Sequence, residues 1–111
     1  MLAGDVASCA IIDLELLYSA RTHKDFTTIL RDREALPALD VGQEVFDRAI
    51  AVMERLSRRG EHRGVSIPDL LIAAVAERAG LTVLHYDHDF DLIASVTQQS
   101  VEWIVEPGSV P

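Results

Sequence analysis

Residues 66–96 read SIPDLLIAAVAERAGLTVLHYDHDFDLIASV, and this stretch decides the fold class. The serine and proline that open it are typical helix-start residues, and the apolar residues after them predict a helix over 67–78. Gly80 is placed to end this helix, because glycine readily takes the left-handed conformation found after helix C-termini. A short, mostly apolar strand is expected over 81–86, and a second helix over 88–96. This order of elements indicates an α/β unit.

The same alternation continues on both sides of this stretch. Apolar periodicity and turn residues divide the rest of the chain into further elements. We expect strands over 6–10, 38–41 and 101–105 and helices over 11–21, 23–34 and 42–59. Strands that alternate with helices of this length predict a parallel sheet covered on both faces. The expected fold class is therefore α/β, with three α/β/α layers around a central, mainly parallel sheet and a single domain over 1–111.

Composition is that of an ordinary globular protein, and it argues against some functions. The chain has 111 residues, of which 49% are hydrophobic and 25% charged, and its net charge is −8. This acidic balance argues against a dedicated DNA or RNA binder, whose contact surface is normally basic. It is compatible with an enzyme that acts on nucleic acid through metal ions, because the metals supply positive charge where it is needed.

Other features of the sequence indicate a cytoplasmic protein. The longest apolar run, 70–76, is far shorter than the roughly 20 residues that span a bilayer, so we expect no membrane contact. The chain does not open with the charged and apolar regions of a signal peptide. The single cysteine, Cys9, cannot form an internal disulfide. It fits a reducing cytoplasm, and we expect it to be a small core residue.

Three carboxylates lie at or near predicted helix starts, where ligands bind in open parallel sheets. Asp87 directly follows a predicted strand, Asp69 lies in the first turn of a helix, and Glu15 lies about one turn into another. Asp69 and Asp87 also have structural explanations, as the acidic residue of an S-x-x-D capping box and as a helix N-cap. Glu15 lies on a mostly apolar helix face, where an unpaired carboxylate is costly to bury. Its structural alternative is a position at the rim of the protein that reaches water.

Carboxylates from separate elements indicate a hard divalent cation. Mg²⁺ prefers oxygen ligands. The site offers no cysteine, and the four histidines lack zinc spacing, so Mg²⁺ or Mn²⁺ is favoured over zinc. Ions of this kind activate water and stabilise the oxygens of a phosphodiester during its displacement. The residues thus predict a metal site suited to phosphodiester chemistry.

The segments DLLIAA (69–74), GLTVL (80–84), YDHDF (86–90) and ELLYSA (15–20) resemble the PIN domain, and in particular the VapC toxins of bacterial VapBC toxin–antitoxin pairs. The match covers nearly the whole chain. The resemblance implies a Mg²⁺- or Mn²⁺-dependent endoribonuclease toxin that is usually a homodimer. It further implies a VapB-like antitoxin partner whose C-terminal segment enters the active-site groove.

The resemblance also assigns site residues. By position, Glu15, Asp69 and Asp87 correspond to three of the family's four core acids, which bind the metal and serve catalysis. Asp89 is a weaker candidate for an accessory acid that follows the last of them. The family's first acid ends its opening strand, and Asp5 does not match that position. We therefore expect a domain that is incomplete at its N-terminus, and the alternative to an active nuclease is a catalytically impaired module that binds an antitoxin.

The densest basic patch lies at the C-terminal end of the amphipathic helix over 42–59 and in the break after it. Its members Arg58, Arg59 and Arg63 are candidates for contacts with RNA phosphates. The alternative is that these cations only complement the C-terminal end of that helix, an effect of about 0.3–1 kcal/mol each.

Overall fold

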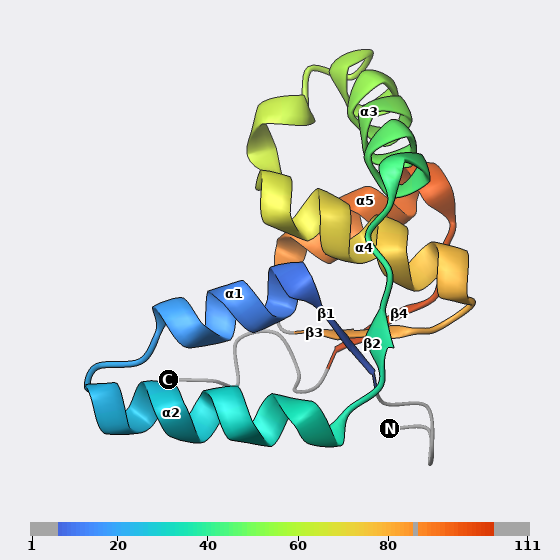
Figure 1. Ribbon diagram of the computed structural model, residues 1–111. Coiled ribbons are helices and arrows are strands. Elements are labelled where there is room, and N and C mark those ends of the chain that lie inside the picture. The colour runs from blue at the N-terminus through green and yellow to red at the C-terminus, as the bar shows by residue number, and fades with distance from the viewer. Residues whose placement is uncertain (1–6, 86, 104–111) are drawn as a thin grey trace. The chain divides into compact units, whose positions relative to one another are not determined.

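The chain divides between Val41 and Gly42 into two units, which we describe separately. The structure is a computed structural model that describes residues 7–85 and 87–103 (Figure 1). The predicted strand ends at Val6, Tyr86 and 104–105 lie outside these described residues. Within the two described ranges, no helix is long and apolar enough to cross a membrane.

The first unit pairs two short strands and adds two helices. Its elements are β1 (Ser8–Cys9), α1 (Ala10–Tyr18), α2 (His23–Asp32), a 3-10 turn (Arg33–Ala35) and β2 (Ala38–Leu39). The two strands are parallel, with Ser8 opposite Ala38 and Cys9 opposite Leu39. Cys9 is buried, which confirms its expected place in a core.

Asp13 holds three parts of the first unit together. Its Oδ1 accepts a hydrogen bond of 2.6 Å from the hydroxyl of Ser8 on β1. Its Oδ2 accepts one of 3.2 Å from Nη1 of Arg33 in the 3-10 turn. These two partners explain how a mostly buried carboxylate is tolerated near the start of an apolar helix.

Helix α1 leaves much of its apolar surface uncovered. None of its nine residues is fully buried. Leu14 is 67% exposed, Leu16 48% and Tyr18 92%. A helix that is apolar nearly all round has more apolar surface than one packing face can cover. The uncovered part is therefore available to another molecule.

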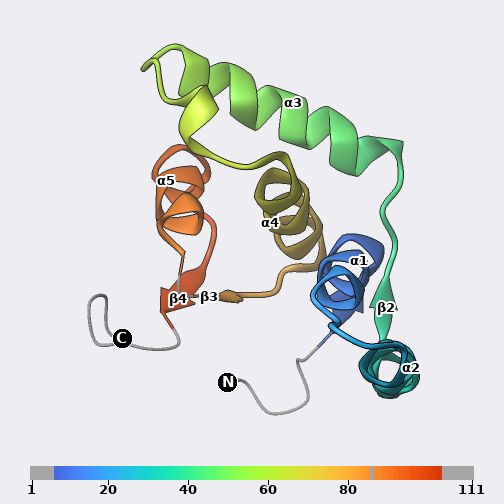
Figure 2. The ribbon, with the colours of Figure 1, turned by 90° about the vertical axis from the view of Figure 1, so that its left-hand side faces the viewer.

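The second unit contains the larger part of the fold. Its elements are α3 (Gln43–Ser57), a 3-10 turn (His62–Gly64), α4 (Ile67–Ala79), β3 (Val83–His85), α5 (His88–Thr97) and β4 (Val101–Trp103). The strands β3 and β4 are parallel, with Val83 opposite Val101. Figures 1 and 2 both show α4 and α5 between α3 and this strand pair.

The core of the second unit lies where α3, α4 and α5 meet. Its buried members are Ala49, Val52, Leu56, Val65, Leu70, Ala73, Val83, Phe90 and Ile93. On α3 the buried residues recur at helical spacing, which confirms the predicted amphipathic helix. Leu56 is completely buried, so the C-terminal end of α3 is anchored in this core.

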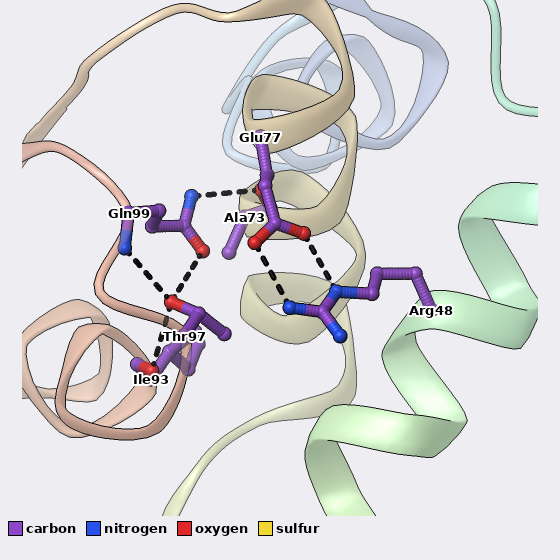
Figure 3. Close-up of polar contacts among 6 residues, drawn as sticks. All are labelled: Arg48, Ala73, Glu77, Ile93, Thr97 and Gln99. Atoms are coloured by element: carbon purple, nitrogen blue, oxygen red, sulfur yellow. Dashed lines mark hydrogen bonds and ion pairs between the residues drawn. The ribbon is translucent and has the colours of Figure 1, made fainter.

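Polar contacts hold α4 from two sides (Figure 3). Arg48 of α3 donates from Nε and Nη2 to the two carboxylate oxygens of Glu77, at 2.7 and 3.0 Å. On the other side, Nε2 of Gln99 donates to the carbonyl of Ala73 at 2.9 Å. The hydroxyl of Thr97 accepts from the backbone N–H of Gln99 at 3.2 Å and steadies that loop. Helix α4 is thus fixed independently of its N-terminal end.

The α/β class and the parallel strand pairing are confirmed. Predicted helix ends agree with the structure within a few residues, and Gly80 caps α4 in the left-handed region with φ of 70°. The strands are shorter than expected: β1 and β2 have two residues each. Short strands carry too few residues for alternation to mark their ends, whereas caps mark helix ends directly.

Candidate metal centre

The N-terminal end of α4 begins with a capping serine. The hydroxyl of Ser66 accepts a hydrogen bond of 3.2 Å from the backbone N–H of Asp69. In a capping box, the acidic side chain three residues on would accept the N–H of the capping residue. In this structure, Oδ2 of Asp89 accepts the N–H of Ser66 at 3.0 Å. The cap of α4 is therefore completed by a residue of α5.

The N-terminal end of α5 is capped by Asp87. Its Oδ1 accepts a hydrogen bond of 2.9 Å from the backbone N–H of Asp89. Helices α4 and α5 run in similar directions, so both N-terminal ends lie on the same side of the second unit (Figure 1). This arrangement brings together carboxylates that are 18 and 20 residues apart in sequence.

Asp69, Asp87 and Asp89 form one acidic cluster. One carboxylate oxygen from each residue lies within 4.8 Å of those from the other two. Asp87 is exposed, and the other two are half-buried. All the cluster's side-chain donors are oxygens, and the members come from two separate elements. This donor set fits a hard divalent cation such as Mg²⁺ or Mn²⁺.

The cluster perturbs the titration of Asp69. The pKa of Asp69 is raised to about 7, chiefly by burial and next by a hydrogen bond with the side chain of Asp89. The charges of Asp87 and Asp89 contribute to this rise, and the hydrogen bond from Ser66 opposes it. A divalent cation at the cluster would favour the ionised form and so reverse this effect.

The structure brings together two of the carboxylates singled out from the sequence, Asp69 and Asp87. It adds Asp89 as a full member of the cluster, although the sequence made it only a weaker candidate. The capping explanation holds for Asp87, whose Oδ1 accepts the N–H of Asp89. It does not hold for Asp69, because Asp89 accepts the N–H of Ser66 in its place. Glu15 lies on α1 in the first unit and is exposed. The argument that its carboxylate would be costly to bury therefore does not apply to Glu15. Its assignment to the metal site stays a prediction.

The basic patch is partly used within the protein. Arg58 pairs with Glu54 on the same helix at 2.8 Å. Arg59 pairs with Glu61 at 2.6 Å, and its Nη2 donates to Ser95 of α5 at 2.6 Å. Arg63 is exposed and makes no ion pair or hydrogen bond with any residue that the structure describes. Arg63 is therefore the member of the patch that these described contacts do not engage, and its contact with an RNA phosphate stays a prediction.

Comparison with known proteins identifies the fold family. The family model of the PIN domain matches residues 1–96. This chain belongs to the PIN-domain family. Ribonuclease VapC21 of Mycobacterium tuberculosis is 48% identical to this PIN domain over 107 residues, which are 96% of this chain and 78% of that protein. Ribonuclease VapC51 of the same species is 44% identical over 108 residues, 97% of this chain and 78% of that protein.

A solved structure also resembles this PIN domain. It is the crystal structure of VapBC-5, a member of the VapBC family of toxin–antitoxin systems, from Mycobacterium tuberculosis. The two share a TM-score of 0.64 and 30% sequence identity, and the match covers 91% of this chain and 82% of that one. The family inferred from the acidic motifs is thus confirmed.

The sequence did not indicate how Ser66 and Asp89 interact. Asp89 stands two residues after an N-cap, a spacing that predicts only its backbone contact with Asp87. Its side-chain contact with Ser66 spans 23 residues and depends on how α4 packs against α5. The sequence signals for these caps are the S-x-x-D pattern over 66–69 and the D-x-D pattern over 87–89. Neither pattern predicts a contact between the two helix starts.

Proposed function

We propose that this PIN domain is the toxin of a type II toxin–antitoxin pair, an endoribonuclease that hydrolyses RNA phosphodiester bonds with Mg²⁺ or Mn²⁺. The observation that carries the proposal is the cluster of Asp69, Asp87 and Asp89. It occurs in a chain 48% identical, over 96% of its length, to a protein named as a ribonuclease. We expect one domain, with Glu15 of α1 as a further ligand.

Each group has a defined task in this reaction. A water molecule bonds through its oxygen to phosphorus and gives up a proton, one phosphorus–oxygen ester bond breaks, and the leaving oxygen takes a proton. Asp69 and Asp87 would hold the ion, which would supply activation of water and charge stabilisation at the phosphate. Arg63 offers its guanidinium to an RNA phosphate, a contact that a chain of net charge −8 needs. The Arg48–Glu77 pair keeps α4, and with it Asp69, in place.

Cleavage of RNA by the purified chain tests the proposal. We expect cleavage in Mg²⁺ or Mn²⁺, its loss in EDTA, and its loss in Asp69→Asn. Asp25→Asn is the matched control, because Asp25 is also in the first turn of a helix but lies outside the acidic cluster. Cleavage that persists in EDTA or in Asp69→Asn would refute the proposal. A chain that never cleaves RNA but binds its antitoxin would instead be a catalytically impaired module.

A VapB-like antitoxin is the proposed protein partner. The VapBC-5 structure supports it, since VapBC-5 is a member of the VapBC family of toxin–antitoxin systems. The exposed Leu14, Leu16 and Tyr18 of α1 support an apolar contact surface. The test is co-purification with the product of the neighbouring gene. Tyr18→Glu is expected to weaken the complex, whereas Thr28→Glu on the exposed surface of α2 is expected to leave it intact.

A homodimer is the proposed assembly. Phe46 and Ile50 lie one turn apart on α3, and they are 43% and 64% exposed. Apolar side chains so arranged favour pairing of two identical surfaces about a two-fold axis. We expect light scattering to give about twice the chain mass of 12.2 kDa, and Ile50→Glu to give the monomer mass.

We also propose that the protein acts in the cytoplasm. The proposed RNA substrate and the unpaired Cys9 support this location.

A further inference from the structure

We propose that Asp89 is a positioning residue that joins the N-terminal ends of α4 and α5 and thereby sets the separation of Asp69 and Asp87. The inference rests on the proposed metal-dependent function and extends it. In this role Asp89 acts through hydrogen bonds to the backbone, and its negative charge is not what the site requires of it.

The first observation is the cap of α4. The backbone N–H of Ser66 is one of the unpaired donors at a helix start and needs an acceptor. Oδ2 of Asp89 supplies that acceptor at 3.0 Å. In a local capping box this task would fall to Asp69. Because Asp89 takes it, the carboxylate of Asp69 is released to face the other acids.

The second observation is that Asp89 contacts both helix starts at once. Its backbone N–H donates to Oδ1 of Asp87 at 2.9 Å, and its side chain accepts from Ser66. The hydroxyl of Ser66 in turn accepts the N–H of Asp69 at 3.2 Å. A continuous line of three hydrogen bonds therefore begins at one proposed ligand and ends at the other.

The third observation concerns what anchors the two helices elsewhere. The middle of α4 is held by Gln99 through the carbonyl of Ala73, and its C-terminal end is held by Arg48 through Glu77 (Figure 3). Both contacts lie on the C-terminal side of Asp69, and the nearer one is one helical turn away. At the N-terminal end, the side chain of Asp89 links α5 to α4 through the N–H of Ser66 and through the side chain of Asp69. Its loss would let the two carboxylates move apart.

A ligand and a positioning residue differ in what they require of position 89. A ligand of a hard cation requires a negative oxygen, whereas the N–H of Ser66 requires only an acceptor. Asp89→Asn keeps an acceptor and removes the charge. Asp89→Ala removes both, and Asp89→Ser has an oxygen too short to reach Ser66. Asp91→Asn, in the first turn of the same helix but outside the cluster, is the matched control.

The experiment measures Mn²⁺ affinity by paramagnetic resonance and hydrogen exchange at the Ser66 amide by NMR, both on the full chain. We expect Asp91→Asn to keep the Mn²⁺ affinity within about threefold, and Asp89→Asn to weaken it by clearly less than Asp89→Ala does. Asp89→Ala and Asp89→Ser should weaken it by about tenfold or more, the usual effect of removing a group that orients a ligand. Protection of the Ser66 amide should survive in Asp89→Asn and be lost in the other two.

Two results would overturn the inference. One is an Mn²⁺ affinity that falls as far in Asp89→Asn as in Asp89→Ala, which would make Asp89 a charged ligand. The other is a Ser66 amide that stays protected in Asp89→Ala. The hydrogen-exchange measurement at the Ser66 amide needs no metal. It therefore tests the positioning role of Asp89 separately from the proposed metal-dependent function. A parent chain that binds no Mn²⁺ would refute the proposed function, while the exchange data would still decide whether Asp89 joins α4 to α5.

Discussion

Raising the pH from about 4 to about 7.5 without metal is expected to destabilise the fold through Asp69. Burial and its acidic neighbours raise the pKa of this carboxyl from 3.8 to about 7. The folded protein therefore holds this proton more tightly than the unfolded chain does. Stability from this proton is fully present below the unfolded pKa and is lost as the pH rises through the folded pKa. The free energy of unfolding should fall across this window.

The size of the effect follows from the shift. About three pKa units correspond to about 4 kcal/mol for a fully buried group. Asp69 is only half-buried, so solvent screening reduces the expected change to the order of 1–2 kcal/mol. In Asp69→Asn this contribution is absent, and the metal-free variant should be more stable than the parent near neutral pH by a similar amount.

The assay is urea unfolding of both proteins in EDTA at a series of pH values. The difference between their free energies of unfolding isolates Asp69, because other titrating groups contribute to both curves. Saturating Mg²⁺ should stabilise the parent near neutral pH, since an ion that binds only the folded state adds stability. The same addition should have much less effect on Asp69→Asn. Two curves with the same pH dependence would refute the reasoning.

Three further predictions follow from the described contacts. Arg48→Met removes the ion pair that makes two hydrogen bonds with Glu77. It should lower the free energy of unfolding by about 1–2 kcal/mol, because a half-buried carboxylate loses its partner. An unchanged urea midpoint would contradict this. Gln98 has a left-handed backbone with φ of 62°. Gln98→Gly should relieve this strain and raise the free energy of unfolding by about 0.5–1 kcal/mol, and with it the melting temperature. A lower melting temperature would argue against it. Arg63→Ala should weaken RNA binding and reduce its salt dependence by about one ion. Arg59→Ala should chiefly reduce thermal stability, because Arg59 joins the turn after α3 to α5. Equal effects of both changes on RNA binding would disprove this division.

Most of the fold was predictable because its helices carry local signals. Ser66 and Gly80 mark the two ends of α4, and the structure finds the first as the N-cap and the second in the left-handed region. The limits of the strands were harder to predict, since β1 has only two residues and its pairing with β2 depends on distant parts of the chain. The exposure of Tyr18 was also not predictable from the sequence. An apolar pattern indicates a preference for burial but does not show whether another element covers the residue.

The candidate site was predictable in part, for a related reason. Asp69 and Asp87 stand at helix starts, and the ends of parallel strands bring such positions together. The contribution of Asp89 depends on the packing of α4 against α5, which no local pattern encodes. Glu15 was singled out for its apolar surroundings, yet its side chain is exposed on α1. Its proposed role now rests on its family position alone.

The two capped helix starts also bear on the order in which the site is filled. Each helix N-terminus carries the equivalent of about half a positive charge. When all three carboxylates are ionised, two such termini directed at them leave a net charge of about −2, which one divalent ion neutralises. An empty site therefore repels the RNA backbone, and a loaded site does not. The metal should bind first and the RNA second, so that the affinity for even an uncleavable RNA rises with the concentration of the ion.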